Sequence, residues 1–245
     1  MTMHANQQQE HTTMPERTCV IVGGSRGIGL ATALRLANQD YNVVIAARTQ
    51  TGLDDAIQKV AATGAACAAV TADVGEPAEA SQVIEAAVER FGRVDVLVNC
   101  AGVAPLAPIE ELKTDDFEQL LDVNIRSVFY TTRAAWPIMR TQRGGVIVNI
   151  SSMASVDPFP GFAAYGASKA WVNLFSQAIA AEGRPHGIRV FSVAPGAVET
   201  SLLRATFPDA PADKALDPDQ VAAVVTSVCA EHMTPCSGQT IFVRK

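Results

Sequence analysis

Short runs of small and β-branched apolar residues alternate with helix-spaced segments along this chain, and this alternation constrains the fold most. Six segments with helical spacing lie near residues 28–38, 53–62, 78–91, 115–140, 164–181 and 218–230. Parallel strands require crossovers, and helices in the crossovers cover both faces of a sheet. We therefore predict an α/β fold with a doubly wound, seven-stranded parallel sheet. Its strands are expected at residues 19–22, 43–47, 66–71, 94–98, 146–151, 188–193 and 239–243.

The length and composition are compatible with one domain. Of the 245 residues, 48% are hydrophobic and 18% are charged, which is enough apolar material for a large core. No linker or charge block divides the chain, so residues 17–245 are predicted to form a single domain. Residues 1–16 are polar and rich in Gln, and we interpret them as a disordered tail because they lack the apolar stretch of a secretory signal.

The charges, cysteines and histidines limit the partners of the protein. A net charge of −6 gives no general attraction to nucleic acid or anionic lipid, and no apolar run approaches the ~20 residues of a membrane span. The five cysteines are far apart, and the four histidines have no metal-ligand spacing. We expect free thiols in a reducing compartment, hence a cytoplasmic protein without a metal, a membrane or a nucleic-acid partner.

A glycine-rich turn, Gly-Gly-Ser-Arg-Gly-Ile-Gly, follows the first predicted strand. Glycines permit a tight turn and let the backbone approach a pyrophosphate, and the following helix offers free N–H groups and the positive end of its dipole. A plain turn is the alternative, but the position after the first strand of an alternating chain favours a dinucleotide site. The predicted contacts are Gly23, Ser25, Arg26, Gly27, Ile28 and Gly29.

The spacing Gly-x-x-x-Gly-x-Gly resembles that of the short-chain dehydrogenase/reductase family, in its compact single-domain branch with a Rossmann fold. Within this family the chain is most similar to the 3-oxoacyl-carrier-protein reductase type, and the likeness extends from about residue 17 to residue 243. Val22 departs from the family's Thr, and Cys100 departs from the second Asn of the motif Asn-Asn-Ala-Gly. The resemblance implies a nicotinamide cofactor and a small-molecule carbonyl or alcohol substrate.

The end of the second strand bears on the choice between NAD and NADP. NAD-binding folds place an acidic residue there, whereas this chain has Ala47 followed by Arg48. Arg48 and Arg26 could bind a 2′-phosphate, because a guanidinium offers parallel N–H groups to phosphate oxygens. Both arginines could instead be ordinary surface charges. We predict NADP(H) in preference to NAD(H).

Further segments at strand ends are implied as cofactor contacts by the resemblance. Asp73 would contact the adenine, with a turn cap as the alternative, and the segment after the sixth strand would hold the carboxamide. The implied contacts are Asp73, Val74, Asn99, Ala101, Gly102, Pro195, Gly196, Val198 and Thr200.

Tyr165 and Lys169 form a Tyr-x-x-x-Lys motif whose i, i+4 spacing places both side chains on one helix face. A free tyrosine has a pKa of about 10, and we expect the neighbouring ammonium to lower this pKa by favouring the phenolate. Ser152 lies 13 residues before Tyr165, directly after the fifth strand. This spacing matches the substrate-orienting serine of the family and favours Ser152 over Ser151.

The resemblance implies a role for each of these side chains. Tyr165 would donate a proton to the carbonyl oxygen, Ser152 would hydrogen-bond the same oxygen, and Lys169 would bind the ribose, so that Tyr165 and Lys169 also contact the cofactor. Asn124, within a predicted helix, matches the asparagine that holds a water between the lysine and solvent. A simple polar core contact is the alternative for Asn124.

The segment after Thr200 is expected to form a short lid over the substrate. Arg204 in this lid could meet an acidic group or be a surface charge, and the helix of Tyr165 continues with an apolar stripe that predicts a homotetramer or homodimer. Apolar residues of the lid and of the loop after the fifth strand predict a fairly open, apolar pocket for a medium-sized or extended carbonyl. They are Met153, Phe159, Phe162, Leu202, Leu203 and Phe207.

Together these features predict an NADPH-dependent oxidoreductase that reduces a carbonyl to an alcohol. An NAD-linked alcohol dehydrogenase on the same scaffold is the second hypothesis. A non-catalytic NADP(H)-binding sensor is the third, and the presence of Ser152, Tyr165 and Lys169 counts against it because a sensor needs no proton donor.

Overall fold

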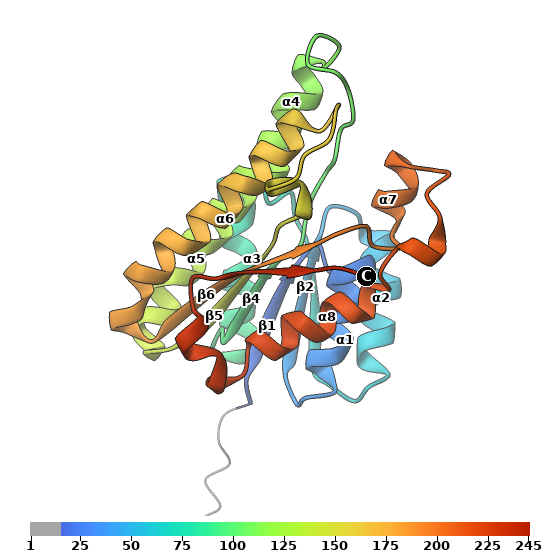
Figure 1. Cartoon of the computed structure of the whole chain (residues 1–245). Helices are drawn as coiled ribbons and strands as arrows, with labels where there is room; N and C mark the ends of the chain where they lie inside the picture. The colour runs from blue at the N-terminus through green and yellow to red at the C-terminus, as the bar shows by residue number, and fades with distance from the viewer. Residues whose placement is uncertain (1–15) are drawn as a thin grey trace, which may run out of the picture.

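One parallel sheet of seven strands forms the centre of the protein in a computed structural model that describes residues 16–245 (Figure 1). The strand order is β3-β2-β1-β4-β5-β6-β7, so the direction of winding reverses between β1 and β4. Ligands of such sheets bind outside the carboxyl ends of the strands at this reversal. The strands are β1 (Thr18–Val22), β2 (Asn42–Ala47), β3 (Cys67–Thr71), β4 (Val96–Asn99), β5 (Gly145–Ile150), β6 (Ile188–Pro195) and β7 (Thr240–Val243).

Helices cover both faces of the sheet, as the alternating sequence predicts (Figure 1). One face carries α1 (Gly27–Ala37), α2 (Gln50–Ala61) and α8 (Pro218–Val228), and the other carries α3 (Pro77–Phe91), α5 (Ser127–Gln142) and α6 (Ala163–Gly183). Two shorter helices, α4 (Thr114–Leu121) and α7 (Ser201–Thr206), project beyond the carboxyl ends of the strands. Residues 1–15 lie outside the described part of the chain, so the predicted tail and the domain boundary at residue 17 stay predictions.

The core consists of two apolar layers, one on each side of the sheet. Along β1, Cys19 and Ile21 pack toward α1 and α8, while Val20 and Val22 pack toward α3 and α5. Successive side chains of a strand point to opposite faces, so a strand covered on both faces must be apolar throughout. Each fully buried Val or Ile contributes about 1.5–3 kcal/mol, and this burial holds the strand ends in place.

The predicted helix at 115–140 is divided in the structure. α4 continues into a π-helical turn, Asp122–Arg126, before α5 begins. A π turn inserts one residue into the helical repeat and often marks a functional position. Strand β4 begins at Val96 and not at Val94, because the backbone of Val94 exchanges two hydrogen bonds, of 3.0 and 2.8 Å, with the side chain of Gln142.

Within the described residues, no helix combines the length and the apolar character needed to cross a membrane.

Candidate functional site

A cavity of about 710 Å³ lies at the carboxyl ends of the strands, where the winding of the sheet reverses. Its walls come from the glycine-rich turn after β1, the end of β2, the loops after β3 and β4, and the start of α7. This volume is within the range of about 300–1,000 Å³ that is usual for cofactor and small-molecule sites.

The glycine-rich turn brings the backbone close to this cavity. Gly23 has φ of +77°, and a Cβ atom there would lie 2.6 Å from the backbone nitrogen of Ala101. At Gly29 a Cβ atom would lie 2.3 Å from the carbonyl oxygen of Gly23. Only glycine avoids both clashes. No side chain caps the N-terminus of α1, so its first N–H groups can receive the phosphates of a dinucleotide.

Three cations line the same cavity. Arg26 and Arg48, which the sequence singled out, are exposed, and Lys59 of α2 joins them. None of the three forms an ion pair within the described residues. The carboxylate of Asp55, one helical turn before Lys59, lines the cavity as well. The cavity therefore presents cations in excess, but it is not free of carboxylates.

Most of the predicted cofactor contacts lie in the cavity wall. Thr200 closes the far side: a Cβ atom on Gly27 would lie 3.1 Å from its Cγ2. Asp73 lines the wall and also caps a turn, because its Oδ1 accepts a hydrogen bond of 3.0 Å from the N–H of Gly75. The lining residues that were predicted are Gly23, Ser25, Arg26, Gly27, Ile28, Arg48, Asp73, Val74, Ala101, Gly102 and Thr200.

The remaining predicted cofactor contacts do not line this cavity, and one of them, Asn99, belongs to a buried side-chain network. Its side chain is buried and donates to Asn149 at 2.8 Å, while it accepts from Thr131 at 2.8 Å. Asn149 in turn donates to Ser176 at 2.8 Å. This chain of side chains joins β4 and β5 to α5 and α6 in the core. The side chain of Asn99 thus stabilises the fold beneath the cavity. The others outside the wall are Gly29, Tyr165, Lys169, Pro195, Gly196 and Val198.

Tyr165, Ser152 and Lys169 lie together beside the loop after β4. The Ser152 hydroxyl accepts a hydrogen bond of 3.1 Å from the N–H of Ala154 and is the neighbour that lowers the pKa of Tyr165. The hydroxyl of Ser151 is turned away and donates to the carbonyl of Lys169 at 3.0 Å. The Lys169 Nζ lies 5.9 Å from the centroid of the Tyr165 ring. A Cβ atom on Gly102, which lines the cavity, would lie 3.7 Å from this Nζ. The trio therefore borders the cavity.

Burial governs the protonation of this trio. Burial raises the pKa of Tyr165, and the hydrogen bond with Ser152 lowers it less. This is opposite to the lowering that was expected from the ammonium. Burial also lowers the pKa of Lys169 to about 8, with the Cys100 thiol acting in the opposite direction. Removal from water disfavours the charged form of each group, and it is the largest influence on both pKa values.

Lys169 keeps unused hydrogen-bonding capacity. Its Nζ is buried and donates to the carbonyl of Ile150 at 3.0 Å, its one hydrogen bond within the described residues. An ammonium has three donors, and an unsatisfied buried donor costs about 1–3 kcal/mol. Hydroxyl acceptors such as those of a ribose fit this arrangement.

Asn124 lies on the π turn, and its amide contacts protein groups. It exchanges two hydrogen bonds of 2.9 Å with the backbone of Val103 and donates to Ser168 at 3.1 Å. These contacts fasten the loop after β4 to α6. They are the polar core contact that was the alternative, and the predicted water link stays a prediction.

The lid residue Arg204 is bound within the lid itself. Its guanidinium pairs with Glu199 at 2.7 Å and donates to the carbonyls of Pro208 and Ala210 at 3.2 and 2.6 Å. Arg204 therefore folds the segment after α7 back on itself. Its partly exposed ion pair with Glu199 is compatible with the predicted surface charge.

Residues 17–211 match the short chain dehydrogenase family. The chain belongs to this family. It is 33% identical to a 3beta-hydroxysteroid dehydrogenase 1 of Eggerthella lenta, over 93% of this chain and 92% of that protein. It is 36% identical to a 3-oxoacyl-[acyl-carrier-protein] reductase of Synechocystis, over 78% of each chain.

Solved structures share the fold. A 3-ketoacyl-(acyl-carrier-protein) reductase from Brucella melitensis, complexed with NADH, superposes with a TM-score of 0.86 at 31% identity, and the match covers 93% of this chain and 96% of that one. The protein is therefore an oxidoreductase of the short-chain dehydrogenase family, whose members bind a nicotinamide cofactor. No group of three His, Cys, Asp or Glu residues in the described part of the chain could hold a metal ion.

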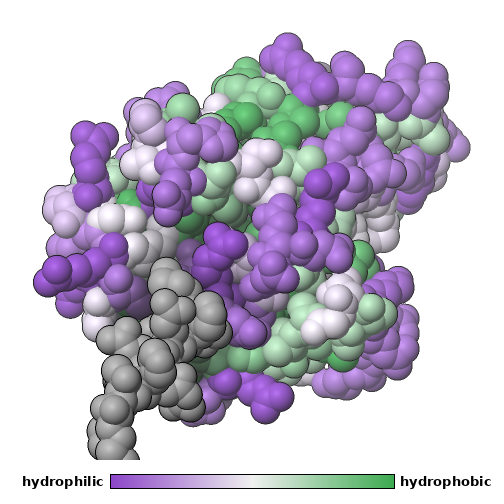
Figure 2. Space-filling model, turned by 90° about the horizontal axis from the view of Figure 1, so that it is seen from below, coloured by the Kyte–Doolittle hydropathy of each residue, from purple (hydrophilic) through white to green (hydrophobic). Residues whose placement is uncertain are grey.

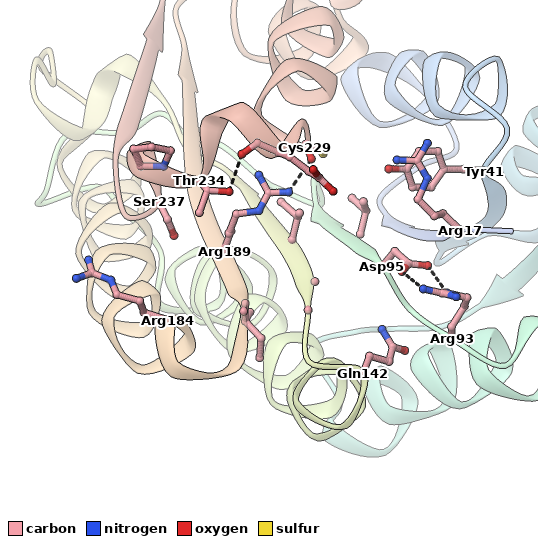
Figure 3. A pocket seen from close by; sticks show the side chains of 18 residues that line it. Arg17, Tyr41, Arg93, Asp95, Gln142, Arg184, Arg189, Cys229, Thr234 and Ser237 are labelled. Carbon is pink, nitrogen blue, oxygen red and sulfur yellow. Dashed lines mark hydrogen bonds and ion pairs between the residues drawn. The ribbon is translucent and has the colours of Figure 1, made fainter. Parts of the chain in front are cut away.

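A larger cavity, of about 880 Å³, lies at the opposite, amino ends of the strands (Figure 3). Hydrophilic residues occupy much of that side of the molecule (Figure 2). Arg93 pairs with Asp95 at 2.7 Å, and Arg189 donates to the carbonyls of Cys229 and Ala230 at 2.7 and 2.6 Å. Arg17 stacks 4.2 Å above the ring of Tyr41. These contacts of Arg93, Arg189 and Arg17 join helix and strand ends and so serve the fold. The larger volume of this cavity therefore does not identify it as the active site.

Sequence reasoning missed two parts of the site. Asp55 and Lys59 lie in the middle and in the last turn of α2, where charged residues at i, i+4 are ordinary for an exposed helix face. Thr131, Asn149 and Ser176 are separated by 18 to 45 positions in the chain, so no local spacing reveals that they form one buried network.

Proposed function

We propose that this enzyme is an NADPH-dependent reductase that converts a ketone, an aldehyde or a 3-oxoacyl thioester to an alcohol. The observation that carries the proposal is the meeting of Ser152, Tyr165 and Lys169 at the border of a cavity with a phosphate-binding turn. A sensor of NADP(H) would need the turn but not a phenol and a serine hydroxyl at the border of the cavity, so these two groups favour an enzyme.

The reaction transfers two electrons to the substrate carbon. A bound NADPH would supply the hydride and be released as NADP⁺. A C–H bond forms at the carbonyl carbon, the C=O π bond breaks, and the oxygen takes the phenolic proton of Tyr165. Ser152 donates a hydrogen bond to the same oxygen and stabilises its developing charge. Solvent returns a proton to Tyr165 after the alcohol leaves, which balances the reaction.

The protonation state of Tyr165 suits the reduction of a carbonyl. Burial raises the pKa of Tyr165, so its phenol carries the proton that the carbonyl oxygen needs. A cationic nicotinamide would favour the phenolate once hydride transfer is complete. Lys169 has donors left over for the ribose hydroxyls, and it places its charge 5.9 Å from the phenol ring.

Arg26, Arg48 and Lys59 support a preference for NADP(H). They line one cavity and have no ion-pair partner within the described residues, which suits a doubly charged 2′-phosphate. An NAD-linked dehydrogenase is the second candidate. Asp55 in the same wall favours it, because a carboxylate can bond ribose hydroxyls and repel a phosphate. The Brucella relative, which is complexed with NADH, is consistent with that alternative.

The test is the oxidation of NADPH and of NADH, followed by absorbance, with a panel of diketones, aldehydes and 3-oxoacyl thioesters. We expect turnover with NADPH that the variant Tyr165→Phe loses while it still binds NADPH. Turnover with NADH alone would contradict the cofactor proposal. Tight NADPH binding without turnover of any carbonyl would favour the sensor.

We also propose that the enzyme is a homotetramer or homodimer. Aromatic side chains gather on the outer surface of α5 and α6: Trp171 stacks on Phe175 at 4.7 Å, and Phe129, 6.3 Å from Phe175, is partly exposed. Leu174 beside them is 67% exposed. Sedimentation at several concentrations tests the assembly. A cytoplasmic location remains a proposal, supported by five cysteines that are free thiols.

A further inference from the structure

Three phenylalanines form a continuous cluster that extends from Tyr165. The rings of Phe162 and Tyr165 have centroids 4.8 Å apart, and Phe159 lies 4.5 Å from Phe162. Phe207 lies 5.7 Å from Phe159 and 5.6 Å from Phe162. We call these three rings the aromatic cluster. Phe162, which contacts Tyr165, is buried, whereas Phe159 is 45% exposed, so the cluster offers aromatic surface one ring away from the proposed proton donor.

Three chain segments surround this cluster and are tied to one another. The N–H of Ala107 donates to the carbonyl of Gly161 at 3.1 Å, and the Thr206 hydroxyl donates to the carbonyl of Ala104 at 3.4 Å. The three segments are residues 102–113 in the loop after β4, residues 152–162 in the loop after β5, and residues 199–214, which include the lid. Exposed large apolar side chains occur in all three, namely Leu106, Ile109, Val156, Phe159 and Leu202. Such a concentration of exposed apolar residues marks a binding surface.

The charges of these segments have one dominant sign. The three segments contain six Asp or Glu residues and three Lys or Arg residues, a net charge of −3. One of the three cations, Arg204, is bound by Glu199 and by two carbonyls, as described above. Lys113 and Lys214 remain, and each lies at the end of its segment. A substrate with a phosphate or carboxylate, or a carrier with an acidic surface, would meet repulsion here.

We infer that the substrate is a neutral, ring-bearing ketone that binds as a free small molecule, and that acyl thioesters on an acidic carrier protein are not the natural substrates. This inference rests on the proposed carbonyl reductase activity and narrows it. Aromatic side chains present flat apolar faces against which alicyclic or aromatic rings pack at little entropic cost. Arg204, the lid residue that could have paired with an anionic substrate, already pairs with Glu199 within the lid.

The test compares four carbonyls at saturating NADPH. Two are decalone, a neutral bicyclic ketone, and a linear ketone of the same carbon number. The other two are acetoacetyl thioesters, one on N-acetylcysteamine and one on an acyl carrier protein. We expect kcat/KM for decalone to exceed that for the linear ketone by about tenfold or more. We expect the carrier-bound thioester to react more slowly than the small thioester, and this deficit to shrink as added salt screens the repulsion.

The variant Phe159→Ala addresses the cluster directly. It should lower kcat/KM for decalone by about tenfold, mainly through KM, and leave the linear ketone and NADPH binding nearly unchanged. The variant Phe242→Ala is the matched control, because Phe242 is exposed to a similar degree, 41%, on β7. It should leave every constant unchanged.

The outcomes separate this inference from the proposed function. Faster turnover of the carrier-bound thioester than of decalone would overturn the substrate class and leave the reductase standing. Equal losses for decalone and the linear ketone in Phe159→Ala would also overturn it. Failure of all four carbonyls, with NADPH binding intact, would overturn the reductase and this inference together.

Discussion

At the amino ends of the strands Arg93 and Arg189 are bound by the protein's own acceptors, whereas Arg26, Arg48 and Lys59 at the carboxyl ends have no ion pair within the described residues. Arg93 and Arg189 of the amino end are held by a carboxylate and by carbonyls (Figure 3). Arg26 and Arg48 of the carboxyl end have no ion pair, and the buried Lys169 uses one of its donors.

This difference separates groups that stabilise the fold from groups kept ready for a ligand. A polar group that the protein itself satisfies contributes to folding, while an unsatisfied one raises the free energy of the folded state. Substitutions at the amino end should therefore change stability and leave activity intact. Substitutions at the carboxyl end should change activity and leave stability equal or higher.

The largest effect is expected for Tyr165→Phe. Loss of the phenolic proton should lower kcat by about 10³-fold, within the usual range for a general acid. The ring and its packing on Phe162 remain, so the midpoint of urea unfolding should change little. Steady-state kinetics and urea titration measure the two quantities. A kcat within tenfold of the wild type would remove Tyr165 from the proposed mechanism.

Lys169→Met should inactivate the enzyme and stabilise it at pH 7. The pKa of Lys169 is about 8 in the folded protein, below its value of about 10.4 in the unfolded chain. The unfolded state therefore binds more protons between these values, and the free energy of unfolding of the wild type rises with pH from about 8 to 10.4. The variant lacks the cost of burying the charged ammonium and should be more stable than the wild type by at most about 3 kcal/mol at pH 7.

Urea unfolding of both proteins between pH 7 and 10 isolates this effect of Lys169. The tyrosines and the thiols other than Cys100 are common to both proteins and cancel in the difference, whereas Cys100 interacts with Lys169 and contributes to it. The stability gap should narrow as the pH rises. A gap that stays constant would show that the ammonium of Lys169 carries no burial cost.

Asp95→Ala, at the amino end, should lower the free energy of unfolding by about 2 kcal/mol. The Asp95 carboxylate is 17% exposed and accepts from the N–H of Thr18 at 2.8 Å as well as from Arg93. The values of kcat and KM should stay unchanged. The matched control is Asp219→Ala, which removes the exposed pair with Arg35 and should cost no more than about 1 kcal/mol. A loss of activity in Asp95→Ala without a loss of stability would contradict the claim that groups at the amino ends serve stability and not activity.

The smallest effect is expected for Arg48→Ala. Loss of a charge-assisted contact with the 2′-phosphate should weaken NADPH binding about tenfold to thirtyfold and leave NADH binding almost unchanged. Fluorescence titration with both cofactors measures this, and Lys59→Ala in the same assay shows whether the third cation contributes. Equal weakening of both cofactors would mean that Arg48 does not distinguish them.

Much of the fold follows from local pattern. The seven strands and their flanking helices were predicted within a few residues because apolar runs and helical spacing are properties of neighbouring residues. The π turn at Asp122–Arg126 was not predicted, since one inserted residue hardly alters the apolar period of a long helix. The rise of the Tyr165 pKa by burial was not predicted, because the motif specifies the neighbour of a group but not its depth of burial.

The sequence by itself determined the parallel sheet, the glycine-rich turn and the spacing of Ser152, Tyr165 and Lys169, because sterics and periodicity act between residues close in the chain. Only the tertiary structure decided which polar groups are satisfied. Asn99 turns into a core network, Arg204 binds its own lid, and Lys169 loses its water. Each of these depends on groups from different elements, and hydrogen bonding and desolvation are set by that three-dimensional environment.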